Sequence, residues 1–325
     1  MKKFINNVDD ILVESLKGFA TAHKDLVSLH LEPIFLTRKV PSMNKVALIS
    51  GGGSGHEPLH TGYLGHGMLD AVCPGHVFTS PTPDQMLAAA DKVNTEKGIL
   101  FIVKNYAGDV MNFEMAAEML PYEVATVLVT DDCAAGDVTA GRGVAGTIIV
   151  EKCVGSLAET GANLQACKAL GDKVNQRTAS MGVALSSCTV PAAGRPTFSL
   201  ADNEVEMGVG IHGEAGHSRE TLRSANEMAA EMLEHILSTL SPTANSEILV
   251  LVNGFGNTPL MELYLIYNSV TELLAAKGLK IARSLVGNYT TALDMAGASI
   301  TLCLLDDEIK QHWDSAVHTP ALRWD

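Results

Sequence analysis

The sequence predicts an α/β fold of two α/β domains, each built on a largely parallel or mixed sheet covered by helices. Short apolar segments alternate with amphipathic segments along the chain, which is typical of sheets whose strands are connected by helices. A length of 325 residues suggests about two domains, at roughly 150 residues each. With 46% hydrophobic and 18% charged residues, the chain can bury a large core.

The first domain is expected over residues 1–189. It opens with an amphipathic helix, because apolar residues recur at helical spacing at Val8, Ile11, Leu12, Leu16 and Phe19. Three apolar runs are typical of buried strands, at residues 45–49, 98–103 and 124–129. Helices are expected between these strands, through residues 86–90 and from about 112 to 120.

One helix start is clearly marked in the sequence. Thr82 is suited to the N-cap, Pro83 to the first helical position and Gln85 to the third, where its side chain completes a capping box. We therefore expect a helix that begins at Pro83.

The second domain is expected over residues 190–325. Proline and glycine residues between positions 190 and 196 suit a domain crossing. The strands of this domain are expected at residues 248–252, 281–286 and 299–305, and a helix from about 260 to 277.

Charge and composition exclude several classes of function. A formal net charge of −14 argues against nucleic acid and anionic membranes as partners. The N-terminus lacks the apolar stretch of a secretory signal, and no run approaches 18 apolar residues. The six cysteines are scattered, without a C-x-x-C pair, as in reduced core cysteines. The sequence therefore predicts a cytoplasmic protein that neither spans membranes nor binds nucleic acid.

A glycine-rich run ending in a histidine is the most informative motif. Residues 50–58 read SGGGSGHEP and directly follow the strand expected at 45–49. Glycines allow backbone N–H groups to approach a small polar ligand, and His56 adds a group that can act as a base near neutral pH. The run lacks the Gly-Lys-Ser/Thr of a P-loop, and His56 stands where a dinucleotide fingerprint needs its third glycine. We expect a pocket for a small, oxygen-rich ligand.

Further polar residues follow a neighbouring strand. Lys104 and Asp109 come directly after the strand at 98–103, and ligands of α/β sheets collect at the carboxyl ends of strands. We therefore expect His56, Lys104 and Asp109 to lie near one ligand. A purely structural alternative makes Lys104 a solvated strand-end lysine and Asp109 a helix cap.

A second glycine-flanked histidine, His212, lies in the segment GVGIHGE at residues 208–214, and nearby His217 is its rival for a chemical role. His60 follows His56 by four residues, but no acidic partner completes a metal set there, so no metal site is expected. The remaining histidines are expected to be structural.

The motifs occur together in a recognisable order. They are SGGGSGHEP (50–58), FTSPTPD (78–84), KNYAGD (104–109), CTVPAAG (188–194), GVGIHGE (208–214) and HTPAL (318–322). In this order, over essentially the whole chain, they closely resemble the substrate-binding subunits of dihydroxyacetone kinases.

The resemblance implies a covalent mode of substrate binding. The family histidine that matches His212 attacks the ketone carbonyl and holds dihydroxyacetone as a hemiaminal. His56 and Asp109 match the pair that orients the substrate and activates the hydroxyl that accepts phosphate.

The resemblance also assigns residues that hold the substrate. Lys104 and the backbone of Gly53, Ser54 and Gly55 match positions that hydrogen-bond its hydroxyls.

The phosphoryl donor is expected on another chain. No P-loop or kinase signature set is present, and the chain leaves no room for the nucleotide-binding domain of single-chain family members. The resemblance therefore implies no cofactor in this chain, a homodimer, and a separate DhaL-type nucleotide-binding subunit that carries ADP or ATP with Mg. Both a phosphocarrier-linked and an ATP-exchanging partner stay open.

The chain departs from the family pattern between Asp131 and Gly143, where several residues and one arginine are missing and Arg142 is kept. Two alternatives follow from this shortening. The chain could act on another short ketose such as erythrulose, or it could be a triose-binding coregulator of transcription.

Overall fold

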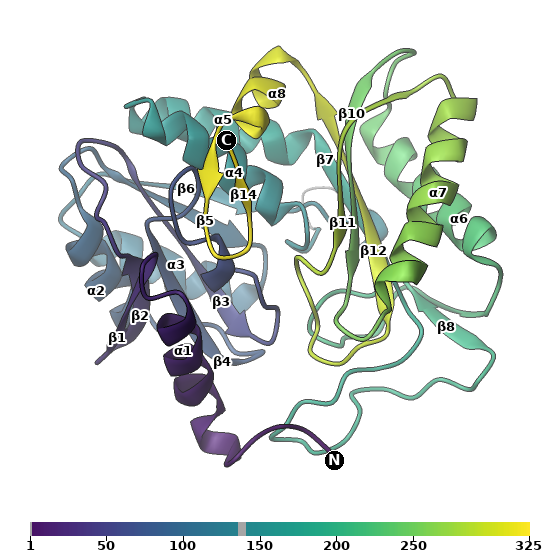
Figure 1. Ribbon diagram of the computed structural model, residues 1–325, viewed down its shortest axis with the longest axis horizontal. Coiled ribbons are helices and arrows are strands. Elements are labelled where there is room, and N and C mark those ends of the chain that lie inside the picture. Colours follow the sequence, from purple (N-terminus) through teal and green to yellow (C-terminus); the bar gives the residue numbers. More distant parts are fainter. Residues whose placement is uncertain (1, 136–140) are drawn as a thin grey trace. The chain divides into compact units, whose positions relative to one another are not determined.

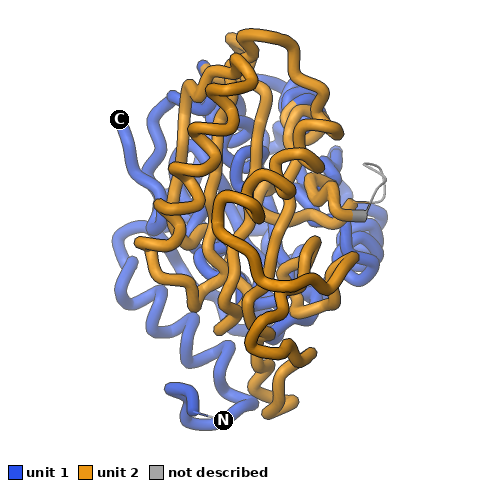
Figure 2. The backbone as a smooth tube through the Cα atoms, turned by 90° about the vertical axis from the view of Figure 1, so that its right-hand side faces the viewer, with its two compact units in different colours: residues 1–129, 148–173, 311–325 blue, residues 130–147, 174–310 orange. Residues whose placement is uncertain are grey.

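The computed structural model describes residues 2–135 and 141–325 as an α/β protein with two six-stranded sheets and helices (Figure 1). The chain divides into two compact units, coloured separately in Figure 2. Unit 1 comprises residues 1–129, 148–173 and 311–325, and unit 2 comprises residues 130–147 and 174–310. Both sheets are mixed, so the predicted fold class is confirmed.

The sheet of unit 1 has the strand order β1-β2-β4-β3-β5-β6. Strands β4, β3, β5 and β6 run parallel to one another, whereas β1 and β2 are antiparallel to their neighbours. Their bounds are β1 Val27–Leu31, β2 Ile34–Arg38, β3 Ala47–Ser54, β4 Ala71–Val77, β5 Ile99–Lys104 and β6 Val124–Val129.

Helices cover the sheet of unit 1, and their bounds are α1 Ile11–Ala22, α2 Pro83–Val93 and α3 Ala107–Met119. Two further helices, α4 Thr147–Glu159 and α5 Leu164–Gln176, lie mostly in unit 1. A core of α2 and α3 side chains such as Met86 and Phe113 packs against sheet residues such as Phe101. The predicted capping box of Thr82 and Gln85 is present at the start of α2. The helix start read from the sequence is therefore confirmed.

The sheet of unit 2 has the order β11-β10-β12-β7-β8-β9, in which only the β10–β11 pair is parallel. Helices α6 and α7 pack against it around a core that includes Leu233, Val250 and Ile300. The bounds are β7 Thr178–Ala184, β8 Glu204–Met207, β9 Ser218–Thr221, α6 Ala225–Leu240, β10 Glu247–Gly254, α7 Leu260–Ala276, β11 Lys280–Gly287 and β12 Gly297–Leu305.

The C-terminal part of the chain forms α8 (Asp307–Asp314) and a small hairpin of β13 (Val317–His318) and β14 (Arg323–Trp324). Residues 311–325 belong to unit 1, where buried Lys152 of α4 donates to the carbonyl of His312. The compact units thus interleave along the sequence, whereas the sequence suggests contiguous domains 1–189 and 190–325. Strand β7 precedes residue 190 but pairs with β12, so residues before 190 contribute to the sheet of unit 2.

Two elements are longer than the sequence indicates. Strand β3 does not end at residue 49 but continues through Ser54, so the first glycines of the motif lie in the sheet. A Cβ on Gly51 would lie 2.4 Å from the carbonyl oxygen of Cys73 on β4, which explains why glycine is needed there. Helix α3 begins at Ala107 rather than near residue 112.

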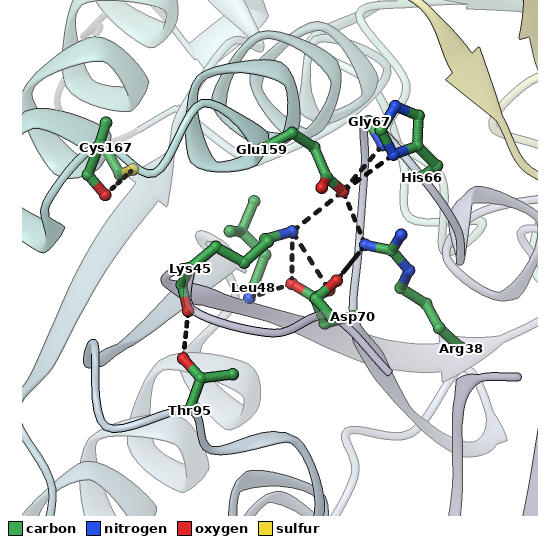
Figure 3. A network of polar contacts seen from close by, with 11 residues as sticks. Arg38, Lys45, Leu48, His66, Gly67, Asp70, Thr95, Glu159 and Cys167 are labelled. Carbon is green, nitrogen blue, oxygen red and sulfur yellow. Dashed lines mark hydrogen bonds and ion pairs between the residues drawn. The ribbon is translucent and has the colours of Figure 1, made fainter. Parts of the chain in front are cut away.

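A network of four charged side chains ties α4 to the sheet of unit 1 (Figure 3). Asp70 pairs with Arg38 and Lys45, both at 3.0 Å, and Glu159 at the end of α4 pairs with Arg38 at 2.7 Å and Lys45 at 3.3 Å. Asp70 also accepts the backbone N–H of Leu48. Burial alone would raise the pKa of Glu159, but Lys45 and Arg38 lower it to about 2. Two positive and two negative charges therefore balance inside this network.

Within the described ranges, no helix is both long and apolar enough to cross a membrane. All six cysteines are described, and all are free thiols. Burial raises the pKa of Cys167 and of Cys303 to about 11, so neither is a thiolate near neutral pH.

Candidate functional site

His56 lies just beyond the end of β3 and is almost fully buried, with 1% exposure. Its ring stacks on Phe78, with ring centroids 5.0 Å apart and an interplanar angle of 14°. Stacking on one face fixes the plane of the imidazole, so its nitrogens point in set directions. A fixed imidazole suits a group that moves a proton at one position.

The glycines before His56 bring backbone and side chains into close approach. A Cβ on Gly52 would lie 2.2 Å from Lys104 Nζ and 3.4 Å from Asp109 Oδ2. A Cβ on Gly53 would lie 2.6 Å from the backbone nitrogen of Thr79. Gly55 has a φ of 106°, and its N–H donates to the Glu57 carboxylate at 3.0 Å. The glycine segment therefore makes room for the polar groups of the next strand.

Lys104 is the last residue of β5 and is fully buried. Its Nζ donates to the carbonyl of Gly51 at 3.2 Å, to His60 Nε2 at 3.1 Å and to Asp109 Oδ2 at 3.3 Å. An ammonium group has three protons, so these three acceptors use its whole donor capacity. A substrate hydroxyl that bonds to Lys104 must replace one of them.

Asp109 is the third residue of α3, where the helix dipole favours a negative charge. It is 2% exposed, and Lys104 is its ion-pair partner. The predicted convergence of Lys104 and Asp109 at the carboxyl edge of the sheet is thus observed, and His56 follows the adjacent strand at that edge. The structural alternative for Lys104, a solvated lysine, is wrong.

His60 also belongs to this cluster, although its spacing of four residues from His56 does not reveal its acidic partner. Its Nδ1 lies 2.6 Å from Glu151 Oε1 and 3.1 Å from Ser50 Oγ, while its Nε2 faces Lys104. Glu151, on α4, is 0% exposed. A signal was present in the sequence, because Glu151 and Lys152 interrupt the apolar run at residues 148–154.

Burial controls the ionisation of this pair. It lowers the pKa of His60 well below the ordinary value, and the charges of Lys104 and His56 act in the same direction. Burial raises the pKa of Glu151 to about 8, against the opposing effect of Lys104. A neutral His60 therefore lies between a buried lysine and a buried carboxyl group.

A small cavity of about 80 Å³ lies beside the glycine segment. Its walls include Gly52, Gly53 and His60, and Leu16 and Phe19 of α1 close it on another side. Because one water occupies about 30 Å³ in the liquid, this space suits a group of few atoms. His56, Lys104 and Asp109 are not among the residues that line it.

His212 lies in unit 2, in the loop that joins β8 to β9. Its backbone N–H donates to Glu214 Oε2 at 2.8 Å, which folds the loop back on itself. Gly213 has a φ of 71°, and a Cβ there would lie 2.6 Å from Cys188 Sγ. The glycine after His212 is therefore required both by conformation and by space.

Arg142 braces the loop that carries His212. Its guanidinium pairs with Asp132 at 2.6 Å and with Glu214 at 3.2 Å, and it donates to the carbonyl of Gly208 at 2.7 Å. Arg142 is the arginine that the shortened family stretch keeps, and residues 136–140 of that stretch lie outside the described residues. The contacts from Asp132 through Arg142 to Glu214 thus end at the backbone N–H of His212.

The rival histidine has a different environment. His217 is exposed and directly precedes β9, and its ring centroid lies 5.7 Å from that of His235 on α6. Among the residues that the structure describes, no group of three or more His, Cys, Asp or Glu side chains could hold a metal ion.

The roles predicted for His56, Asp109, Lys104, His212 and the backbone of residues 53–55 stay predictions.

Comparison with known proteins reveals relatives over nearly the full chain. Residues 17–321 match the family described as "Dak1 domain". The chain is 48% identical to the "PEP-dependent dihydroxyacetone kinase, dihydroxyacetone-binding subunit DhaK" of Escherichia coli (strain K12), over 100% of this chain and 99% of that protein. This alignment spans 355 positions, more than the 325 residues of this chain, so the relative contains residues without a counterpart here.

Two solved structures are similar in fold and sequence. The dihydroxyacetone kinase of C. freundii in complex with AMP-PNP and Mg²⁺ gives a TM-score of 0.89 at 34% identity, covering 99% of this chain and 61% of that chain. The "Dihydroxyacetone kinase operon co-activator Dha-DhaQ" also gives 0.89 at 34% identity, covering 95% of this chain and 96% of that chain.

Proposed function

Because the chain belongs to the Dak1 domain family, we propose that it is the dihydroxyacetone-binding subunit of a dihydroxyacetone kinase. It holds the ketone while a separate DhaL-type subunit transfers a phosphoryl group to a substrate hydroxyl, which yields dihydroxyacetone phosphate. The observation that carries this proposal is the buried Lys104–Asp109 pair beside the glycine segment, in a chain 48% identical to a dihydroxyacetone-binding subunit.

His212 is the nucleophile in this proposal. The neutral imidazole adds to the carbonyl carbon, a C–N bond forms, and the carbonyl oxygen takes up a proton to complete a hemiaminal. A three-carbon ketone offers few atoms for non-covalent contacts, so a covalent bond supplies affinity that contacts alone do not. Glycerol has no carbonyl and is therefore rejected.

His56 and Asp109 act on the hydroxyl that receives the phosphoryl group. One of them removes the hydroxyl proton as the new O–P bond forms, and the other orients the group. Lys104 and the backbone of residues 53–55 hold the substrate hydroxyls. The glycines support this role because a Cβ on Gly52 would occupy the space that Lys104 Nζ takes beside Asp109.

The phosphoryl donor belongs to the partner subunit, which carries ADP or ATP with Mg. The name of the E. coli relative includes "PEP-dependent", which supports a phosphocarrier-linked partner with a bound ADP. The charge and composition of the chain support a cytoplasmic protein, and the family resemblance supports a homodimer. Oxidation of glycerol is a reaction that supplies dihydroxyacetone, so a place in glycerol metabolism fits.

A coregulator is the second candidate, because the co-activator structure has a TM-score of 0.89 to this chain. The identity of 34% to the co-activator is lower than the 48% to the kinase subunit. A sensor needs no general base, whereas His56 and Asp109 are both present here and both buried. The kinase subunit is therefore the better-supported function.

Reconstitution tests the proposal. The purified chain with dihydroxyacetone and MgATP should form no dihydroxyacetone phosphate, yet it should still bind the ketone. Adding a DhaL-type subunit with its phosphocarrier proteins and phosphoenolpyruvate should start turnover, measured as dihydroxyacetone phosphate formed. Turnover by the lone chain would refute the two-subunit assignment, and ketone binding without turnover under all donor conditions would favour the coregulator.

A further inference from the structure

We propose that His60 and Glu151 are positioning residues for phosphoryl transfer, which act by holding Lys104 Nζ against the Asp109 carboxylate. This inference rests on the proposed kinase function and extends it to two side chains that do not belong to the predicted site. The four residues form one chain of contacts, Asp109–Lys104–His60–Glu151, with distances of 3.3, 3.1 and 2.6 Å.

The donors in this chain fix the tautomer of His60. A lysine ammonium group can only donate, so His60 Nε2 must accept from Lys104. The single ring proton of neutral His60 is therefore on Nδ1, where it points to Glu151 Oε1 at 2.6 Å. At 2.6 Å this contact is slightly shorter than a charge-assisted N–H···O bond, which spans about 2.7–2.9 Å. His60 thus transmits the negative charge of Glu151 to Lys104.

Burial of the Glu151 carboxyl group costs free energy, and an apolar side chain at this position would avoid that cost. It is completely buried on α4, and its Oε2 has no hydrogen-bond partner within the described part of the chain. A buried charged group is expensive in free energy and is often replaceable by an apolar one without loss of stability. Ser50 adds a second contact that holds the imidazole, since its Oγ lies 3.1 Å from Nδ1. The arrangement is typical of a functional site.

The consequence for the site is the direction of the Lys104 ammonium group. With one proton held by Gly51 and one by His60, the third is directed to Asp109 Oδ2 and to a substrate hydroxyl bound beside it. Without His60, Nζ has a free donor direction and can turn away from Asp109. The orientation of Asp109, and with it removal of the substrate proton, then becomes less well defined.

The pair should also give turnover a specific pH dependence. The titratable groups that face it are Lys104, His56 and, through Lys104, Asp109. Below the raised pKa of Glu151 the carboxyl group is neutral, so Oε1 accepts more weakly from Nδ1 and His60 in turn accepts more weakly from Lys104. The contacts are therefore strongest when Glu151 is ionised, and turnover should rise as the pH passes about 8.

The stability of the fold should change in the opposite sense. A carboxyl group whose pKa is raised on folding stabilises the fold fully below its ordinary pKa, and this contribution is lost as the pH rises through about 8. Replacing Glu151 by the isosteric neutral glutamine should then leave thermal stability equal or higher at pH 9. A residue that matters only for folding would show a loss instead.

Four variants, assayed with the reconstituted partner, test the inference. His60→Asn keeps a donor near Nδ1 but removes the acceptor for Lys104, whereas His60→Gln keeps an acceptor near Nε2. We expect kcat to fall about 30- to 100-fold for His60→Asn and less than about 10-fold for His60→Gln, with KM within about 3-fold. Glu151→Gln should lose about 10-fold in kcat at pH 9 and should lack the rise near pH 8. The matched control is His66→Gln, which removes a histidine beside Glu159 in the same unit and should change neither kcat nor the pH profile.

The outcomes separate the inference from the proposed function. If the wild-type chain shows no turnover with any partner, the kinase function fails. If it turns over and the His60 and Glu151 variants keep its kcat and its pH profile, the inference is overturned. It is also overturned if the Glu151→Gln variant loses thermal stability together with activity while the rise near pH 8 persists.

Discussion

Substitution of Gly52 by alanine should abolish most of the activity while leaving the fold stable. The new Cβ would lie 2.2 Å from Lys104 Nζ, whereas an ordinary contact needs about 3.5 Å, so the ammonium group must retreat by about 1.3 Å. The contacts of Nζ with Gly51, His60 and Asp109, at 3.1 to 3.3 Å, cannot all survive a shift of this size. A misplacement of about 1 Å in an active site can reduce the rate about 100-fold, or about 2.7 kcal/mol. We therefore expect kcat to fall about 100-fold.

The fold should tolerate this change because the atom in the way is the end of a flexible side chain, and because Gly52 does not have a positive φ. Turnover with the reconstituted partner and the thermal unfolding midpoint are the two measurements. Gly18→Ala is the matched control, since nothing lies within 4 Å of its Cβ position on the exposed side of α1, and it should keep full activity. Retention of kcat within about 3-fold by the Gly52→Ala variant would refute the assigned position of Lys104.

Three further predictions concern His212, Arg142 and Glu159. His212→Ala should lose covalent capture of dihydroxyacetone, as measured by intact-protein mass or crystallography. Arg142→Met should weaken ketone binding about 10-fold, because the ion pair that holds Glu214 is lost. Exposed Arg195→Met is the control for Arg142→Met and should bind the ketone as wild type does. Tight binding and full turnover by His212→Ala would contradict the nucleophile assignment. Because the pKa of Glu159 is lowered to about 2, its stabilisation is present above its ordinary pKa near 4.5 and is lost as the pH falls through 2. In urea unfolding, the free energy of unfolding of Glu159→Gln should be lower than that of wild type at pH 7 and closer to it at pH 3. The control, exposed Glu114→Gln, should match wild type at both pH values. If the difference between Glu159→Gln and wild type is as large at pH 3 as at pH 7, the role of Glu159 in the charged network is contradicted.

Local patterns predicted the elements that position the site. The alternation of strands and helices located β5, β6 and β10 to within a few residues, because buried strands leave short apolar runs between polar turns. The rule that parallel strands gather ligands at their carboxyl ends correctly placed Lys104 beside Asp109. These features depend on residues close together in sequence.

The missed features depend on contacts between distant segments. His60 and Glu151 are 91 positions apart, and no local pattern joins a histidine after β3 to a carboxyl group on α4. A glycine-rich run predicts a loop, but the first glycines lie in β3, where the close approach of β4 and Lys104 leaves no room for a Cβ. The partner of a buried charge is decided by tertiary packing, which the sequence of one element does not contain.

The three acceptors of Lys104 have a consequence for how this family can diverge. Gly51, His60 and Asp109 come from separate segments, yet each loses its partner when Lys104 is replaced. Loss of Asp109 would leave the buried Lys104 ammonium group without its counter-charge, so replacement of that carboxylate alone should be strongly destabilising. Descendants of this chain should therefore keep or lose Lys104 and Asp109 together, whereas His60 and Glu151 can be lost without such a penalty once phosphoryl transfer is abandoned.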